Sequence, residues 1–175
     1  MKYLQLCCLS LIIFMASCAN GGNTKSKISS DKSDAAPVVA DKEKRASALS
    51  IWDYRIKEND GKSFPVVEAD IWEYRFVFDG DEMSPPGSYD GQWIDYKPDF
   101  TYDYGKNTTI EGSGKYHYSL DDSLLLMIDD DASKNPVQYE TKFAGDVMVL
   151  VGNTEYGSNP YQMKLERVPD ATYKK

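Results

Sequence analysis

The sequence predicts an all-β protein built as a single antiparallel meander β-barrel of about eight strands. After Leu49, short runs rich in Trp, Tyr, Phe, Val and Ile alternate with polar residues, which is the pattern of half-buried strands. Gly, Pro, Asn and Asp separate these runs at short intervals, which favours hairpins over crossover connections. A sheet of this size must protect its edges, and closure into a barrel removes them.

The apolar runs define the expected strands in order. The first two, Ile51–Lys57 and Asp70–Phe78, contain the closely similar hexapeptides IWDYRI and IWEYRF, as expected for neighbouring strands with the same inward face. Turn residues such as Asn59-Asp60-Gly61 and Asp79-Gly80-Asp81 follow them. The other expected strands are Gly91–Tyr96, Phe100–Tyr104, Thr109–Leu120, Leu124–Asp129, Val137–Phe143, Val147–Val151 and Tyr161–Val168.

Aromatic residues dominate the expected interior of the barrel. A barrel of about eight strands is either filled by its own side chains or holds one small ligand. Tyr and Trp have flat apolar faces and a polar tip, so they suit a ring-bearing ligand as well as a packed core. The residues predicted to face the interior and bind a ligand are Trp52, Tyr54, Trp72, Tyr74, Phe76, Trp93, Tyr102, Tyr104, Tyr116 and Tyr118.

The N-terminus has the pattern of a secretory signal. A Lys precedes the apolar stretch Leu4–Met15, which is shorter than the roughly 20 residues that a membrane-spanning helix needs. Met15-Ala16-Ser17-Cys18 resembles a bacterial lipobox, and this resemblance implies cleavage before Cys18 and lipidation of its thiol. We therefore expect a signal peptide over 1–17 and a protein anchored to a membrane through the lipid on Cys18.

The segment that follows Cys18 is polar, small in side-chain size and mixed in charge. It cannot bury enough apolar surface to offset its ordering entropy, so residues 18–48 are predicted to form a disordered tether and residues 49–175 the barrel domain. A short helix over Asp41–Leu49 is the alternative at its end, because Lys42-Glu43-Lys44-Arg45-Ala46 are fair helix formers.

Most of the expected barrel resembles the lipocalin-like (calycin) domain lipoproteins of the Bacteroidetes type. The matching residues are Trp52 on strand one, Gly114-Lys115-Tyr116-His117-Tyr118, Leu124-Leu125-Leu126, Asp146-Val147-Met148-Val149-Leu150 and the closing strand Tyr161–Val168. The resemblance implies a barrel lipoprotein of the outer membrane. Surface-exported members carry acidic residues soon after the lipidated Cys, whereas the first one here is Asp31, which favours the periplasmic face.

Composition argues against several other functions. The net charge of −8 disfavours binding to nucleic acid. His117 is the single histidine, which weakens both a Ser–His nucleophile and a transition-metal site. The acidic turns, one at Asp129-Asp130-Asp131 with Asn135 and another at Asp79, Asp81, Glu82 and Asp90, lack the spacing of a calcium loop and are interpreted as solvated. No metal or cofactor is therefore expected.

The sequence thus favours a binding protein over an enzyme. The first hypothesis is a membrane-anchored lipoprotein that binds a small apolar or ring-bearing ligand inside the barrel. The alternative is a protein-interaction or inhibitor module with a filled barrel and an exposed aromatic patch near the Asp79–Asp90 loop. A hydrolase that uses paired acids or His117 is the third hypothesis.

Overall fold

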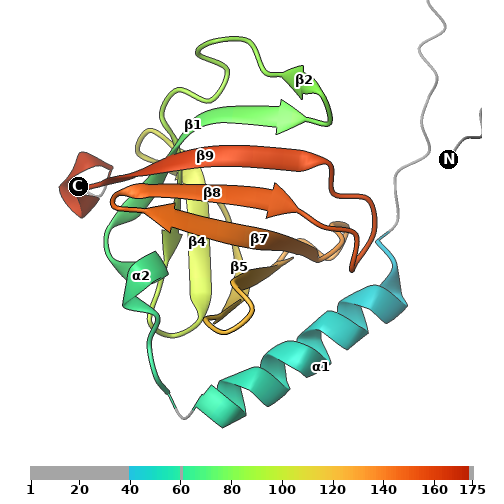
Figure 1. Cartoon of the computed structure of the whole chain (residues 1–175). Coiled ribbons are helices and arrows are strands. Elements are labelled where there is room, and N and C mark those ends of the chain that lie inside the picture. Colours follow the sequence, from blue (N-terminus) through green and yellow to red (C-terminus); the bar gives the residue numbers. More distant parts are fainter. Residues whose placement is uncertain (1–39, 60, 174–175) are drawn as a thin grey trace, which may run out of the picture. The chain divides into compact units, whose positions relative to one another are not determined.

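The computed structural model describes residues 40–59 and 61–173 of the chain (Figure 1). Two α-helices precede the sheet, α1 (Lys42–Asn59) and α2 (Pro65–Glu68), and the 3₁₀ turn η1 (Asp170–Thr172) follows it. No helix in these two stretches is both long enough and apolar enough to cross a bilayer. The strands are β1 (Ile71–Asp79), β2 (Glu82–Met83), β3 (Gln92–Tyr96), β4 (Thr101–Lys106), β5 (Thr109–Ser119), β6 (Leu124–Asp129), β7 (Val137–Ala144), β8 (Val147–Gly152) and β9 (Tyr161–Val168).

The strands form the predicted closed antiparallel meander of eight strands. From β3 to β9 each strand pairs with the next one along the chain, and β9 pairs with β1 to close the barrel. The short strand β2 is an additional hairpin partner for the end of β1 and was not expected from the sequence. Eight of the nine expected strands are present with ends within two residues of their predicted positions.

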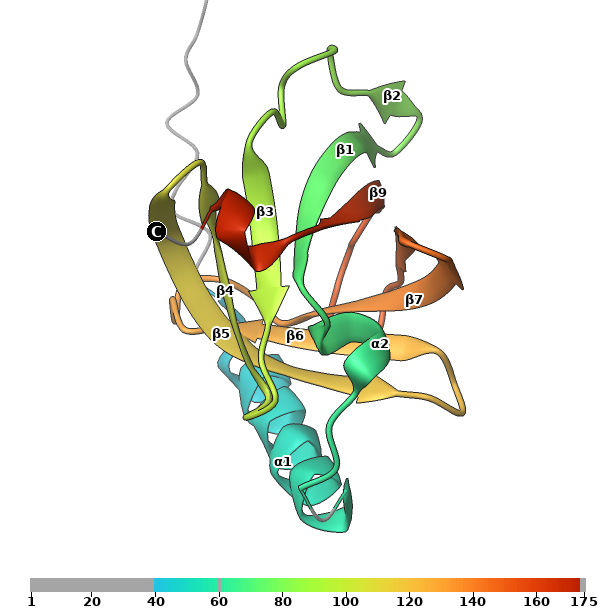
Figure 2. The same ribbon diagram turned by 90° about the vertical axis from the view of Figure 1, so that its left-hand side faces the viewer.

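The two ends of the barrel differ in how they are covered (Figure 2). Helix α2 lies at the end where β1 begins, and we call this the α2 end. The connections 79–92, 106–109, 129–137 and 152–161 meet at the other end, which we call the open end. Because every strand runs antiparallel to its neighbours, each side chain's position along its strand fixes how close it lies to either end.

Helix α2 closes its end of the barrel through three contacts. The indole Nε1 of Trp72 donates to the carbonyl oxygen of Val67 over 2.7 Å, and the hydroxyl of Tyr116 lies 2.8 Å from Oε1 of Glu68. Nη2 of Arg167, on β9, donates to the carbonyl oxygen of Val66 over 3.1 Å, and the same guanidinium lies 4.9 Å from the centroid of the Trp72 ring. The Trp near the start of strand one is thus Trp72, whereas the resemblance to lipocalin-like lipoproteins had assigned this place to Trp52, which lies in α1.

Aromatic rings fill the barrel near the α2 end. Tyr96 and Tyr116 meet edge to face with their centroids 4.9 Å apart, and Tyr118 meets Phe143 in the same way at 5.8 Å. Aromatic pairs of this geometry add to the stabilisation that burial provides. Other buried residues of the core cluster include Trp72, Ile94, Tyr102, Leu125, Met127, Met148, Leu150 and Leu165.

The predicted strand Ile51–Lys57 is wrong, because these residues lie within α1. Asp41 caps the helix, with its Oδ1 accepting from the backbone N–H groups of Glu43 and Lys44 at 3.0 and 3.2 Å. The alternative of a helix over Asp41–Leu49 is correct at its start, but the helix continues to Asn59. The folded region thus begins earlier than residue 49, and the part of the tether predicted over 18–39 lies outside the described residues, as do Cys18 and the signal peptide.

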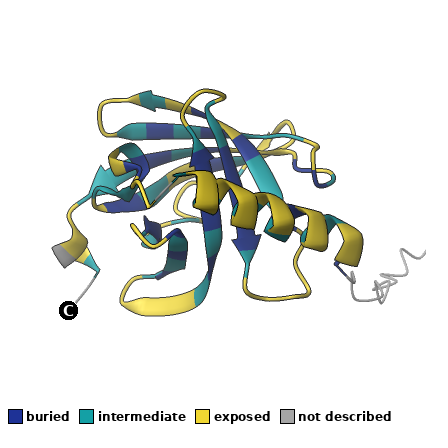
Figure 3. Cartoon of the chain, turned by 90° about the horizontal axis from the view of Figure 1, so that it is seen from below, coloured by how far each residue is buried: buried dark blue, intermediate teal, exposed yellow. Residues whose placement is uncertain are grey.

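Helix α1 packs on the outer wall of the barrel over β5 and β6 (Figure 3). Ala48, Trp52 and Ile56 recur at the four-residue spacing of one helix face, and they contact the buried outward side chains Leu126 and Ile128 or the main core. The indole Nε1 of Trp52 donates to the carbonyl oxygen of Tyr116 over 2.9 Å. The opposite side of the helix is exposed to solvent.

Candidate functional site

Six of the ten predicted interior residues lie inside the barrel. These are Trp72, Tyr74, Tyr102, Tyr104, Tyr116 and Tyr118, each in the inward register of its strand. Most of them pack in the filled part of the core near the α2 end. Tyr74 and Tyr104 lie closer to the open end, where the interior is not filled.

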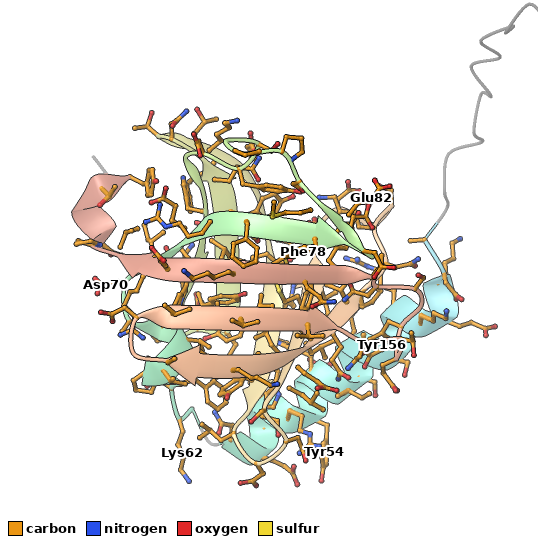
Figure 4. The ribbon with its side chains drawn as sticks, turned by 45° about the horizontal axis from the view of Figure 1, so that its top comes forward. Tyr54, Lys62, Asp70, Phe78, Glu82 and Tyr156 are labelled. Atoms are coloured by element: carbon orange, nitrogen blue, oxygen red, sulfur yellow. The ribbon has the colours of Figure 1, made fainter. Side chains whose placement is uncertain are left out.

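The other four predicted interior residues lie elsewhere. Trp52 and Tyr54 belong to α1, and Tyr54 is 57% exposed (Figure 4). A register shift between Tyr74 and Phe76 places Val77 inside and Phe76 outside, with Phe76 38% exposed. Trp93 lies on the opposite face of β3 from Ile94 and stacks on Tyr173 at 6.0 Å, although it also contributes to the lining of a cavity beside Gly105.

A cavity of about 270 Å³ occupies the open end of the barrel. Most of its wall is aromatic, with six ring-bearing side chains: Tyr74, Tyr89, Trp93, Tyr104, Tyr139 and Tyr161. Val77 and Met163 add apolar surface, and Gln92 and Glu111 are the polar side chains in the lining. This combination of a mainly apolar wall and few polar groups is typical of small-molecule sites.

Two glycines on β5 make room for the tyrosines of β4. A Cβ atom on Gly112 would lie 2.2 Å from the hydroxyl of Tyr104, and one on Gly114 would lie 2.6 Å from Cζ of Tyr102. Both contacts are far shorter than van der Waals separation, so larger residues at these positions would displace the phenol rings. The glycines therefore let the two rings lie flat against the inner wall and leave the space beyond them free.

The phenol groups of the cavity lie close enough together to raise one another's pKa values. Burial, reinforced by the neighbouring phenols of Tyr139, Tyr89 and Tyr104, holds the pKa of Tyr74 well above its usual value. Burial likewise raises the pKa of Tyr139 to about 12. These hydroxyls are protonated at neutral pH and can donate hydrogen bonds, while their rings offer neutral π faces to a ligand.

Residues of both β1 and β3 line the cavity beside the point where these strands separate, and we call this side of the cavity its mouth. These strands pair at Trp72↔Ile94 and Glu73↔Trp93, after which β1 continues toward β2 instead (Figure 2). The Ser84–Asp90 loop spans the space between them. Its Tyr89 ring stacks on Tyr74 with centroids 6.0 Å apart, so this loop residue forms part of the cavity wall.

A charged pair supports Tyr104 at the open end. Its hydroxyl lies 3.0 Å from Oδ2 of Asp129, and Nζ of Lys134 lies 2.7 Å from the hydroxyl and 2.8 Å from the same carboxylate oxygen. Burial lowers the pKa of Lys134, but the hydrogen bonds to Asp129 and Tyr104 outweigh it and raise the pKa overall. The acidic turn at Asp129 thus serves to position a cavity residue.

Several cavity residues were not predicted from the sequence. Tyr139 occupies the inward register of β7 opposite Leu125, and the alternation of β7 could have revealed it. Tyr161 begins β9, and Tyr89 lies in a loop where no periodicity applies. Glu111 lines the cavity because the register between β4 and β5 shifts after Tyr104, and no sequence pattern announces that shift.

A second cavity, of about 240 Å³, lies outside the barrel between the end of α1 and the β5–β6 turn. His117 lines it and meets Phe64 edge to face at 5.6 Å. Burial, with a smaller contribution from Arg55, lowers the pKa of His117 to about 4. The nearby hydroxyl of Ser119 donates to Oδ2 of Asp122 over 2.8 Å, so it does not donate to His117.

Within the described part of the chain, no three His, Cys, Asp or Glu side chains gather as metal ligands do.

Comparisons with known proteins give one structural neighbour of note. No protein-family model matches the chain, and no curated protein is similar to it. A crystal structure of a DUF4847 family protein from Bacteroides vulgatus ATCC 8482 is similar, with a TM-score of 0.41 and 8% identity over 57% of this chain and 93% of that one. Similarity at this level assigns neither a family nor a ligand to the chain.

Proposed function

We propose that this protein is a membrane-anchored, lipocalin-like binding protein that holds a small ring-bearing ligand in the open-end cavity. The observation that carries the proposal is the wall of six aromatic side chains around about 270 Å³ of space. An engineered apolar cavity of about 150 Å³ accommodates benzene, so the volume here suits one substituted ring or a compact bicyclic compound. Binding, without catalysis, is the action proposed for this site.

The depth of the aromatic wall supports a ligand inside the barrel. Tyr74 lies in the inward register of β1 and still retains accessible surface, because its ring borders the cavity. The filled part of the core, with Tyr96 and Tyr116 at its centre, forms the floor. A ligand that entered from the open end would therefore contact rings on its sides and below it.

The proposed location follows from the N-terminal sequence. Lipidation of Cys18 would anchor the chain to the outer membrane, and the late first acidic residue, Asp31, favours the periplasmic face. Labelled palmitate should enter the wild-type protein and not a Cys18→Ser variant. Incorporation of palmitate into both proteins, or into neither, would refute the lipid anchor. It would not affect the proposal that the cavity binds a ligand.

Filling the cavity tests the proposed binding. Val77 is 2% exposed and lines the cavity, so a Val77→Trp substitution should occupy its space. Val149→Trp, on the outer face of β8, is the matched control for the larger side chain. Calorimetric titration with indole and with 2-phenylethanol should show binding to the wild type and to Val149→Trp, and loss of binding in Val77→Trp at an unchanged circular dichroism spectrum. Equal binding by all three proteins would refute the proposal.

Protein interaction remains the second candidate function, favoured by one surface. Phe76 and Phe78 meet edge to face at 5.6 Å on the outer side of β1, and Met83 of β2, which pairs with Phe78, is 58% exposed (Figure 4). A photoreactive residue at position 76 should then cross-link a protein of defined mass in the native envelope, while one at Glu140 on the outer face of β7 should not. Identical cross-linking patterns at both positions would exclude this function.

A further inference from the structure

The charged residues of the open end are mostly acidic. The connections that meet there carry more carboxylates than ammonium groups. The carboxylates belong to Asp79, Asp81, Glu82, Asp90, Asp129, Asp130, Asp131 and Glu155, and the ammonium groups to Lys106 and Lys134. From outside the connections, Lys115 and Arg45 also bind the 129–137 connection, through the Asp130 carboxylate and the Asp129 carbonyl oxygen respectively. Charge of one sign around a concave opening concentrates counter-ions there, so the rim favours the approach of a cation.

One acidic residue lines the cavity itself. Glu111 lines the cavity at the position where the β4–β5 register shifts, and no Lys or Arg occurs among the described lining residues. Glu111 forms no ion pair with another residue of the described part of the chain. Its negative charge beside the cavity is therefore available to a ligand.

The cavity wall itself attracts cations. The faces of Tyr and Trp rings carry partial negative charge, and an ammonium group within about 6 Å of a ring centroid is stabilised by it. The protein already contains one such contact, because Nζ of Lys134 lies 5.0 Å from the centroid of Tyr104. The ion pair of Lys134 with Asp129, at 2.8 Å, balances its charge, so it does not oppose a second cation in the cavity.

From this arrangement we infer that the open-end cavity selects organic cations, namely compact ring compounds that carry an ammonium group. The inference rests on the proposed function and adds the charge of the ligand to it. The ring of the ligand packs among Tyr74, Tyr89 and Tyr139, and its ammonium group lies near Glu111. A neutral compound of the same shape keeps the ring contacts but lacks the attraction to the carboxylate and to the π faces.

Three compounds of nearly equal size test the charge preference. These are 2-phenylethylamine, 2-phenylethanol and phenylacetate, which are cationic, neutral and anionic at pH 7. Calorimetric titration of the full lipidated chain in a maltoside detergent should give the tightest binding for the amine, about tenfold tighter than for the alcohol, because cation–π and carboxylate contacts add together. Phenylacetate should bind more weakly than the alcohol. Raised NaCl should reduce the advantage of the amine, since salt screens the rim.

A pair of matched variants locates the source of the preference. Glu111→Gln keeps the shape of the side chain and removes its charge, so the amine should lose about threefold in affinity while the alcohol is unaffected. Glu140→Gln makes the same change in net charge on the outer face of β7, where the side chain does not line the cavity, and should leave both affinities unchanged.

The outcomes separate this inference from the proposed function. Equal affinities for the amine and the alcohol, or tighter binding of phenylacetate, would overturn the charge preference and leave ring binding intact. An equal loss of amine affinity in Glu111→Gln and Glu140→Gln would overturn the role of Glu111 as well. Absence of binding for all three compounds would count against the inference and the proposed function together.

Discussion

Tyr89 lies against Tyr74 with ring centroids 6.0 Å apart and ring planes 30° from parallel. One ring belongs to the Ser84–Asp90 loop and the other to the barrel wall, so the stack joins a surface loop to the inner wall of the cavity. The loop crosses the space that opens where β1 and β3 separate. Access to the cavity therefore depends on a side chain that can move without disturbing the sheet.

Removal of the Tyr89 ring should widen the mouth with little effect on stability. Tyr89→Ala should accelerate dissociation of a bound ring compound about tenfold, because the loss of one stacking contact weakens both the wall and its cover. Stopped-flow fluorescence measures this rate. Ser88→Ala, one residue earlier in the same exposed loop, is the control and should leave the rate unaltered. A wild-type rate in Tyr89→Ala would show that the ring does not cover the cavity.

Helix α1 should depend on Trp52 for its attachment. Most of the stability of a helix in a protein comes from the packing of one of its faces, so the packing of α1 on β5 and β6 holds it in place. Trp52→Ala removes the contact with the Tyr116 carbonyl and should lower the free energy of unfolding by about 2 kcal/mol, with faster amide exchange throughout α1. Tyr54→Ala, at an exposed position on the same helix, should change it by less than about 0.5 kcal/mol. Similar exchange profiles for the two variants would contradict this packing.

His117 should make the protein less stable in acid. The folded state holds the pKa of His117 at about 4, against 6.5 in the unfolded chain. Above pH 6.5 both states carry the neutral ring and the full stability is present; as the pH falls from 6.5 to 4, only the unfolded state takes up the proton, so stability is lost. Because the chain has a single histidine, the proton NMR signal of an untagged sample reports this titration directly.

The control for the acid effect is His117→Gln, which cannot take up the proton. Its free energy of unfolding should vary less between pH 6.5 and 4 than that of the wild type, when both are measured by urea denaturation. A histidine NMR signal with its midpoint near 6.5 in the folded wild type would contradict the burial of this ring.

The glycine at position 114 should be more sensitive to substitution than a turn glycine. A Cβ on Gly114 would lie 2.5 Å from the carbonyl oxygen of Ile128, which is backbone and cannot yield easily. Gly114→Ala should therefore destabilise the fold by about 3 kcal/mol. Gly145→Ala meets no atom within 4 Å and carries only the strain of its positive φ, about 1 kcal/mol. Equal urea midpoints for the two variants would show that the inner wall tolerates a larger residue.

The barrel was predictable from the sequence because alternation and turn residues report local structure. The same reasoning failed for IWDYRI at 51–56, which is helical, while the similar IWEYRF at 71–76 forms β1. Context separates them: Asp41 caps a run of helix-forming residues ahead of the first, and Asp70, with φ of 62°, redirects the chain just before the second. The four-residue spacing of Ala48, Trp52 and Ile56 indicates a helix, but the alternation of apolar and polar residues in IWDYRI favoured a strand.

The cavity was less predictable than the fold. Phe76 was placed on the wrong face because a one-residue register shift reverses every later side chain in its strand. Glu111 reaches the cavity through a similar shift. The space itself exists because β1 and β3 separate after Glu73, and that separation depends on long-range pairing of β1 with β9. Such relations between distant strands leave no periodic trace in the sequence.

A crystal structure of the protein with 2-phenylethanol or 2-phenylethylamine bound tests the central claim most directly. The claim predicts ring density in the open-end cavity between Tyr74 and Tyr139, with the Tyr89 ring beside it. Density confined to the cavity beside His117 at the α2 end, or an open-end cavity that stays empty at saturating ligand, would contradict it.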